Sequence, residues 1–509
     1  MDRYRRMFAF ALAVPLALRS PAAPDTVRID GGRVAGTTAD GVRRYKGLPF
    51  AAPPVGDLRW KPPQPVVAWT GVRAADAFSP ECPQVPYPAG SAYASAPAPM
   101  NEDCLYLNVW TAANPGEQRP VMVWIHGGAW TRGSASVGAY DGANLARKGV
   151  VLVTVNYRLG PLGFFAHPEL SAESPQHASG NYAILDHVAA LRWVQKNIAA
   201  FGGDPSRVTI FGVSAGSWSV NTLQATPLAR GLFHRAIGES GSTFGRTATL
   251  ADAEQGGVAL GKALGAESLK ALRAVPAEKL VAALAFRTEV NVDGWVLGDE
   301  VRNIFSETKH NLVPVLVGSN ADEFTTLSNQ AFFPKSMDGF GKLRDAQFPG
   351  MTGEFDAAYP VKSEADIAGV LLQVGRDQTF TLGMRTWARM ATAGGQKAFL
   401  YQFTHVPPGP NPAWGAYHAS EIAYVFNNVH SRPWAQELDT RLADQLSTYW
   451  INFATTGDPN GAGLPAWPAY DAATEPYLEL GDVVQSKHHL LKAQLDFLEQ
   501  SLQRRKAPR

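Results

Sequence analysis

One serine of this chain stands in a pattern that activates a hydroxyl group for nucleophilic attack. Ser214 lies within the segment Gly212 to Gly216, directly after the apolar run Val208 to Phe211 and before a stretch compatible with a helix. A G-x-S-x-G pattern between a strand and a helix indicates a tight turn, in which side chains larger than glycine would clash. Such a turn projects the serine hydroxyl into a cleft and points the N–H group of Ala215 at the same space. We therefore predict that Ser214 is a nucleophile.

The base that would accept the proton of this serine is sought among the histidines that follow it. Serine nucleophiles need such a base, and they need a carboxylate that orients it. Where the G-x-S-x-G turn occurs, the acid and then the histidine follow in the chain. His418 lies in a glycine-flanked stretch that begins at Gly415, whereas His405 is closer to the end of the preceding apolar run. Spacing favours His418 and leaves His405 open.

The acid should follow another strand of the core. The apolar run Val313 to Val317 leads into a short polar segment that contains Asp322 and Glu323. Either carboxylate could reach an imidazole from such a loop, so spacing does not choose between them. The other carboxylate could cap the helix that follows.

A glycine-rich segment follows a further apolar run, Val121 to Ile125. Attack on an ester carbonyl places negative charge on its oxygen, which must be met by preorganised hydrogen-bond donors. Glycines allow the backbone to approach that oxygen closely. We predict that the N–H groups of Gly127, Gly128 and Ala215 form this oxyanion hole.

The order of apolar and helical segments predicts an α/β fold. From about residue 105, apolar runs alternate with helical patterns, which is expected of a large, mostly parallel central sheet with helices on both faces. Two long helical insertions, about 244–290 and 320–395, are predicted to form the walls of the pocket. A helix is predicted over Tyr182 to Ala200. The predicted strands are Leu105 to Trp110, Val121 to Ile125, Val150 to Val155, Val208 to Phe211, Arg235 to Ile237, Val313 to Val317 and Ala398 to Phe403.

The N-terminus has the composition of an export signal. The basic stretch Met1 to Arg6 precedes the apolar run Met7 to Leu18 and the small residues Ser20 to Ala23. We predict a signal peptide over residues 1–23 and a secreted or periplasmic location. The apolar run is about a dozen residues, too short for a bilayer core of roughly 30 Å, so no stable membrane anchor is expected.

The overall composition excludes several classes of partner. The 509 residues, 45% of them hydrophobic, can bury a large core, and the 46 basic and 45 acidic residues nearly cancel. Binding to nucleic acid is therefore not expected. The two cysteines, Cys82 and Cys104, can pair in an exported protein or can stay as buried thiols. No Cys/His cluster lies beside them at ligand spacing, so no metal site is expected.

Several segments together resemble a known family, the type-B carboxylesterase and cholinesterase-like group of α/β hydrolases, which includes bacterial enzymes similar to para-nitrobenzyl esterase. The resemblance extends from about residue 26 to residue 480. Besides the serine motif, the matching segments are Tyr45 to Ala51, Asn101 to Val109, His126 to Gly128, Asn156 to Arg158, Gly180 to Tyr182, Phe201 to Pro205, Ser240 to Ser242, Asp293-Gly294, Asp322-Glu323, Gly415 to His418 with Glu421, and Tyr449 to Ala454.

The resemblance implies an α/β-hydrolase fold in which residues 24–509 form one domain. It implies that Glu323 is the acid of the triad, that His418 is the base, and that Cys82 and Cys104 form a disulfide. It also implies that Ser240 lies near the triad and that Asn101 and Asp204 hold loops in place. Neither a metal nor an organic cofactor is implied.

One departure from the family's pattern bears on the substrate. Relatives usually carry an acidic residue before the nucleophile, where this chain has Val213, and the segment between the cysteines contains tyrosines but no tryptophan. Cholinesterases use that acidic residue and a loop tryptophan to bind a quaternary ammonium. The expected activity is therefore hydrolysis of neutral, fairly apolar carboxylic esters, rather than choline esters, through an acyl-enzyme on Ser214. The alternatives are a lipase acting at interfaces and a non-catalytic interaction protein. The natural ester and the oligomeric state stay open at this level.

Overall fold

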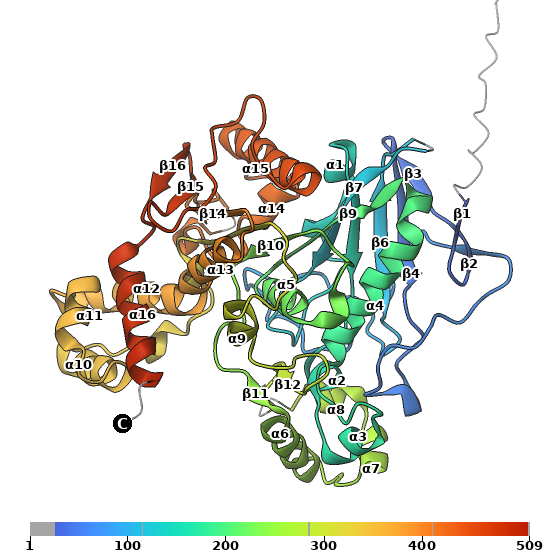
Figure 1. Ribbon diagram of the computed structural model, residues 1–509, viewed down its shortest axis with the longest axis horizontal. Coiled ribbons are helices and arrows are strands. Elements are labelled where there is room, and N and C mark those ends of the chain that lie inside the picture. The colour runs from blue at the N-terminus through green and yellow to red at the C-terminus, as the bar shows by residue number, and fades with distance from the viewer. Residues whose placement is uncertain (1–25, 115, 284–285, 410, 507–509) are drawn as a thin grey trace, which may run out of the picture.

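A large mixed sheet runs through the molecule (Figure 1). The computed structural model describes residues 26–114, 116–283, 286–409 and 411–506, so the predicted signal peptide over residues 1–23 lies outside the described residues. The strand order is β16-β15-β14-β13-β10-β9-β7-β8-β6-β4-β3. Their bounds are β3 Thr37–Ala39, β4 Val42–Pro49, β6 Tyr106–Thr111, β7 Arg119–Ile125, β8 Val151–Val155, β9 Gly203–Val213, β10 Arg235–Glu239, β13 Val315–Asn320, β14 Ala398–Phe403, β15 Pro476–Leu480 and β16 Val484–His488.

The middle of this sheet is parallel. Strands β8, β7, β9, β10, β13, β14 and β15 pair in parallel, each with its neighbour in the sheet. They are buried along most of their length, as expected of strands that are covered on both faces. Each apolar run predicted as a strand is a strand. The bounds of β14 are those predicted, whereas those of the other strands are shifted; β9, for example, extends beyond the predicted run at both ends.

The pairing of β6 differs from the prediction. The sequence predicts this strand as one of a mostly parallel sheet. In the structure it is antiparallel to β8 and to β4. Only residues 112–118 connect β6 to β7. A parallel connection needs a crossover of about a dozen residues or more, so this short link reverses the chain direction. The sheet is therefore antiparallel at this end, and also at β15–β16.

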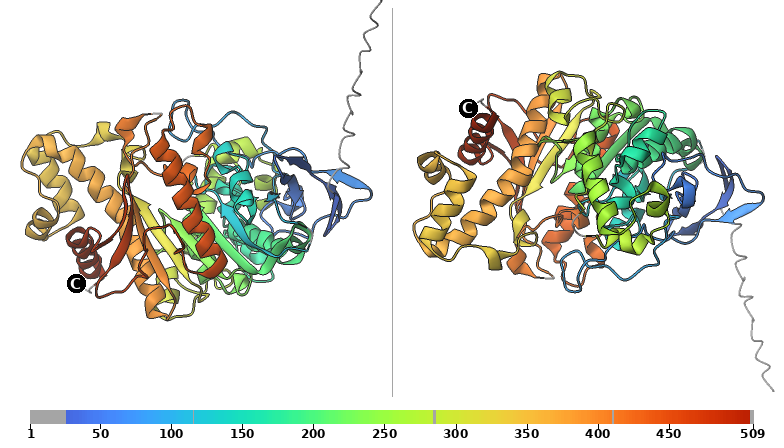
Figure 2. Two further views of the ribbon diagram at one scale, coloured as in Figure 1. Left: turned by 90° about the horizontal axis from the view of Figure 1, so that it is seen from above. Right: turned by 90° about the horizontal axis from the view of Figure 1, so that it is seen from below.

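Helices cover both faces of the sheet, as predicted, because alternate strand residues point to opposite sides. On β7, Val123 packs in one core with α4 (Tyr182–Asn197), α5 (Ala215–Ala225) and α13 (Leu382–Ala393). Its neighbour Trp124 packs in a second core with α15 (Glu437–Thr456). Figure 2 views the sheet from opposite sides, with α15 in front in the left view.

The two predicted insertions consist of several helices each. The first holds α6 (Leu250–Ala263), α7 (Leu269–Arg273) and α8 (Ala277–Val281). The second holds α10 (Met337–Gln347), α11 (Thr352–Ala358) and α12 (Ile367–Arg376), which share a separate core with α16 (Lys492–Lys506) and lie beside it in Figure 1.

Shorter elements complete the fold. Among the described residues, no helix has the length and apolar character needed to cross a membrane. The remaining helices are α1 Ala143–Arg147, α2 Gly160–Phe164, α3 Pro168–Glu173, α9 Val301–Ser306 and α14 Ile422–Val425, and the remaining strands are β1 Thr26–Ile29, β2 Gly32–Ala35, β5 Val72–Ala74, β11 Ala248–Thr249 and β12 Asn291–Val292.

Candidate active site

Ser214 lies on a strained turn between β9 and α5. Its φ angle is +58°, in the left-handed region that residues other than glycine rarely adopt. A Cβ atom on Gly212 would come within 2.5 Å of the carbonyl oxygen of Ile125, and one on Gly216 would overlap the same oxygen. Both glycines are therefore needed for the reason that the motif predicts.

The backbone of Ser214 is held from two sides. Its N–H group donates to the carbonyl oxygen of Glu239, at the end of β10, over 2.8 Å. Its own carbonyl oxygen accepts from the N–H group of Trp218, in the first turn of α5, over 2.9 Å. These bonds fix the strained turn between two neighbouring strands and a helix.

Glu323 and His418 form a buried hydrogen-bonding contact. Nδ1 of His418 lies 2.5 Å from Oε2 of Glu323, and neither side chain is appreciably exposed. The other carboxylate oxygen, Oε1, accepts from the hydroxyl of Ser240 over 2.5 Å and from the N–H group of Asn320 over 2.7 Å. With its carboxylate held by two donors, Glu323 orients the imidazole through Nδ1 and leaves Nε2 for another partner.

No hydrogen bond joins the hydroxyl of Ser214 to His418 within the described part of the chain. Such contacts are often long in the absence of substrate and tighten in the reacting complex. The two residues are nevertheless linked through adjoining backbone. The N–H group of Ser214 donates a hydrogen bond to the carbonyl oxygen of Glu239. The hydroxyl of the next residue, Ser240, donates one to Glu323.

Asp322, the competing carboxylate, has a different contact. Its Oδ2 accepts from the N–H group of Ala416 over 2.8 Å, and its own N–H group donates to the carbonyl oxygen of Ala416 over 3.0 Å. Asp322 therefore clamps the loop that carries His418. The expectation that the second carboxylate caps the following helix is wrong, because the side chain of Asp322 makes no capping bond there.

His405, the alternative base, is occupied at both ring nitrogens. Nδ1 lies 2.6 Å from Asp482 and Nε2 lies 2.9 Å from Asp439. A histidine held between two carboxylates has no free nitrogen to accept the proton of a serine, so the contacts favour His418 as the base.

The glycine segment after β7 lies against the nucleophile. A Cβ atom on Gly127 would be 3.1 Å from Cβ of Ser214. Gly128 has a φ angle of +109°, and Ala129 is also left-handed, at +54°. Ala215 is the first residue of α5, so its N–H group has no acceptor within the helix. The structure thus brings Gly127 and Ala215 to the turn of Ser214, with Gly128 next in the chain. Ala129 is a further candidate donor that the sequence did not indicate, although it follows the two glycines directly.

Comparison with known proteins shows the family of this chain. A model described as the carboxylesterase family matches residues 23–498. The chain belongs to the carboxylesterase family. It is accordingly a carboxylic ester hydrolase, an enzyme class whose substrates are small-molecule esters.

Relatives of known activity span nearly the whole of this carboxylesterase. It is similar to the fumonisin B1 esterase of Sphingopyxis macrogoltabida, with 37% identity over 91% of this chain and 88% of that protein. It is also similar to the para-nitrobenzyl esterase of Bacillus subtilis, with 36% identity over 88% of this chain and 93% of that protein. Among solved structures, a carboxylesterase of Geobacillus stearothermophilus superposes with a TM-score of 0.82 and 33% identity, covering 93% of this chain and 99% of that one.

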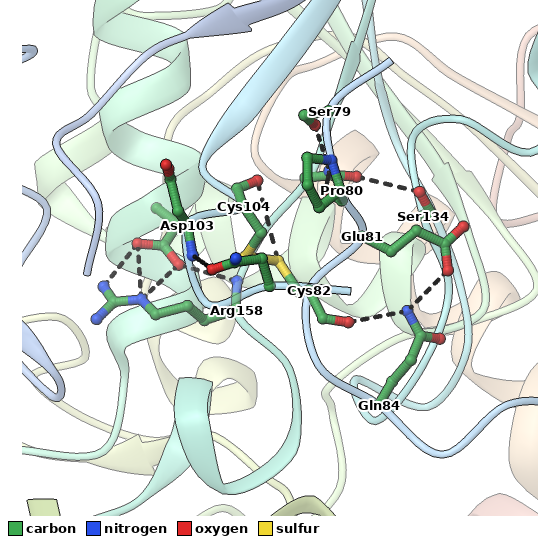
Figure 3. The surroundings of a disulfide bond; sticks show 12 residues. Ser79, Pro80, Glu81, Cys82, Gln84, Asp103, Cys104, Ser134 and Arg158 are labelled. Atoms are coloured by element: carbon green, nitrogen blue, oxygen red, sulfur yellow. Dashed lines mark hydrogen bonds and ion pairs between the residues drawn. A yellow bond between two sulfur atoms is a disulfide. The ribbon is translucent and has the colours of Figure 1, made fainter. Parts of the chain in front are cut away.

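A disulfide closes the loop at one side of the carboxylesterase site. Cys82 and Cys104 are bonded, as the family resemblance implied (Figure 3). Asn101 accepts the N–H group of Asp103 within this loop, and Asp204 accepts that of Ser206 elsewhere, so both hold local turns as predicted.

Two aromatic side chains confine the ring of His418. Phe380 stacks on it with ring centroids 4.8 Å apart, and Tyr93 meets it edge-on at 6.3 Å. Tyr93 comes from the disulfide loop, and its hydroxyl bonds that of Thr326 over 2.7 Å. Phe380 lies in a π-helical turn, Asp377–Thr381, inserted between α12 and α13. Such turns are frequent at functional sites, but no sequence pattern marks this one.

Two further acids, Glu239 and Glu421, are buried near Glu323. Glu239 accepts from Nε1 of Trp450 over 2.6 Å, and Glu421 accepts from Nδ2 of Asn320 over 2.5 Å. Burial first, and repulsion from Glu323 second, raise the pKa of Glu421 to about 7. Burial and the nearby charge of Glu421 also raise the pKa of Glu239 well above its usual value. These carboxyl groups hold protons at pH values where ordinary glutamates are ionised.

Proposed function

We propose that this enzyme is a serine carboxylesterase that forms an acyl-enzyme on Ser214. His418 accepts the proton of the serine hydroxyl as the oxygen attacks the ester carbonyl, and it then donates that proton to the leaving alcohol. Water repeats the sequence in reverse and releases the acid. The observation that carries this proposal is the buried contact between Glu323 and His418. The other carboxylate oxygen of Glu323 accepts a hydrogen bond from Ser240.

The negative charge of the tetrahedral intermediate is assigned to backbone donors. Gly127, Gly128 and Ala215 are the proposed oxyanion hole, and Ala129 is an additional candidate because it is next in the same left-handed turn. Removing one such donor typically costs about a hundredfold to a thousandfold in turnover.

Between neutral and cationic esters, the site favours a neutral, fairly apolar ester over a choline ester. Val213 is 2% exposed and packs towards Gly127, so no carboxylate occupies the position before the nucleophile. The disulfide loop contributes tyrosines, and Tyr93 reaches the ring of His418. An interfacial lipase would share these residues; activity that rises sharply above the solubility limit of the substrate would distinguish it.

We also propose that residues 24–509 act as one exported domain, following a signal peptide over residues 1–23. Disulfides persist in oxidising compartments, so the Cys82–Cys104 bond supports a secreted or periplasmic location. Sequencing the N-terminus of the exported protein tests the cleavage.

The test of the proposed activity compares the purified protein with its Ser214→Ala variant. Both are assayed against p-nitrophenyl esters of graded acyl length, with an acylthiocholine as the cation-bearing control. Serine-dependent hydrolysis with little thiocholine turnover is expected. Equal hydrolysis by the variant would exclude Ser214 as the nucleophile, and absence of any hydrolysis by the unmodified protein would favour the non-catalytic alternative.

A further inference from the structure

Arg132 lies in the turn that follows the glycine segment, beside Gly128. The N–H groups of Thr131 and Arg132 both donate to the carbonyl oxygen of Gly128, over 3.0 and 3.1 Å. A Cβ atom on Gly128 would be 3.2 Å from Cγ of Arg132. The side chain of Arg132 therefore begins next to the proposed oxyanion donors.

A continuous series of ring contacts joins Arg132 to His418. The guanidinium group lies over the ring of Tyr87, 4.9 Å from its centroid. Tyr87 packs against Tyr93 at 5.4 Å, and Tyr93 meets the imidazole of His418 at 6.3 Å. One end of this series therefore adjoins the proposed oxyanion segment, and the other end adjoins the proposed base.

Two hydrogen bonds join the disulfide loop to the turn that carries Arg132. Gly133 donates its N–H group to Oε1 of Gln84 over 2.6 Å and accepts from Nε2 of Gln84 over 2.9 Å. Gln84 lies beside the disulfide in Figure 3. This two-bond clamp fixes the disulfide loop, with Tyr87 and Tyr93, to the turn that carries Arg132.

Arg132 is half buried. Within the described residues it has no acidic partner. Other arginines near the disulfide are paired: Arg59 with Glu102 and Arg158 with Asp186. Val213 leaves the neighbouring position without a negative charge. A guanidinium group has five N–H donors in a planar fork that matches a carboxylate, and here it is placed over an aromatic ring with that fork unused.

We propose that Arg132 binds a carboxylate carried by the ester itself, so that this enzyme prefers esters with a free carboxylate, such as half-esters of dicarboxylic acids, to neutral esters of equal length. The carbon chain would lie along Tyr93 and Tyr87, and the terminal carboxylate would accept the fork of Arg132. A choline ester would place a cation against this arginine. The proposal rests on the serine mechanism above and adds a substrate class to it.

The experiment measures kcat/KM for p-nitrophenyl half-esters of dicarboxylic acids of graded length, from five carbons upward, and each is paired with the p-nitrophenyl alkanoate that has the same chain length without the charge. Ser214→Ala supplies the background rate. The unmodified enzyme is expected to favour the half-ester, and Arg132→Gln is expected to lower the ratio of the two kcat/KM values by about tenfold or more, mainly through KM. Raising the salt concentration from about 0.05 M to about 0.5 M should reduce the same ratio.

Two variants control for structural effects. Arg132→Lys keeps the positive charge and should retain part of the preference. Arg73, whose guanidinium group lies over the rings of Trp69 and Tyr106 in another part of the molecule, offers a matched substitution, and Arg73→Gln should leave the ratio unchanged.

Two results would overturn the carboxylate site. One is a ratio that is the same in the unmodified enzyme and in Arg132→Gln. The other is an equal loss of kcat/KM on both esters, which would assign Arg132 to support of the turn. A preparation that hydrolyses neither ester, or a Ser214→Ala variant that hydrolyses both, would instead contradict the serine mechanism on which this proposal rests.

Discussion

The hydroxyl of Ser240 donates to Oε1 of Glu323 over 2.5 Å, on the carboxylate oxygen that His418 does not contact. Ser240 has a φ angle of +54°, and it follows Glu239, whose carbonyl oxygen accepts the N–H group of Ser214. A single strained residue at the end of β10 therefore adjoins the backbone of the nucleophile on one side and holds the acid on the other.

Ser240→Ala should lower kcat by about tenfold, because the loss of one hydrogen bond to a charged group costs about 1.5–3 kcal/mol and the N–H group of Asn320 still holds the same oxygen. The measurement is kcat/KM as a function of pH. A positioning role predicts that the acidic limb of the profile moves, since Ser240 holds the carboxylate that contacts Nδ1 of His418. An unchanged profile with unchanged kcat would contradict this role.

Glu323→Gln should lower kcat on the order of ten-thousand-fold, because an amide cannot stabilise the imidazolium and favours the wrong tautomer. The matched control is Asp322→Asn, which keeps an oxygen for the N–H group of Ala416 and should retain most activity. Steady-state kinetics on both variants decides between the two carboxylates. The reverse order of losses would assign the acid to Asp322.

Glu421→Gln should change how stability depends on pH. In the folded protein the pKa of Glu421 is raised to about 7, whereas the ordinary pKa of a glutamate is 4.5. Between these values the folded state binds more protons than the unfolded state, so this group makes the protein less stable as pH rises. Glutamine carries no charge, so the Tm of the variant relative to that of the unmodified protein should increase from pH 5 to pH 8.

The matched control for that experiment is Glu278→Gln, at an exposed position on α8. Its Tm difference from the unmodified protein should not change with pH. A Glu421→Gln difference that is flat or falls across the same range would contradict the buried, protonated state of Glu421.

Removing the disulfide with the double change Cys82→Ala and Cys104→Ala should lower the free energy of unfolding by about 3 kcal/mol, mainly because the unfolded chain regains the freedom of the loop. The variant should also have a raised KM, since Tyr87 and Tyr93 lie in that loop. Thermal unfolding with and without a reductant checks both forms. A reductant should destabilise only the unmodified protein, and equal sensitivity of the variant would point to another cause.

The amino-acid sequence by itself determined the strands β6 to β10, β13 and β14 of the central sheet, and the order of the proposed catalytic groups, whereas β15 and β16 were not predicted. The strand Val151–Val155 is buried at every position because helices cover both faces, and its residues other than Thr154 are apolar, which is a local signal. The G-x-S-x-G motif around Ser214 is also a local signal, since its five residues are consecutive in the chain. The sequence pattern did not show the direction of β6, because an apolar run looks the same whether it pairs in parallel or antiparallel; its partners are β4 and β8.

Only the tertiary structure decided between neighbours of similar chemistry. Asp322 and Glu323 are adjacent acids, and their roles differ because one faces the backbone of Ala416 and the other faces His418. Both ring nitrogens of His405 contact carboxylates, those of Asp439 and Asp482, which are distant in the chain, so His405 is disfavoured as the base. The position of Phe380 on His418 depends on a π-helical turn, and the unpaired state of Arg132 depends on which acids lie near it. Such contacts join residues far apart in sequence, so they are set by packing and not by spacing along the chain.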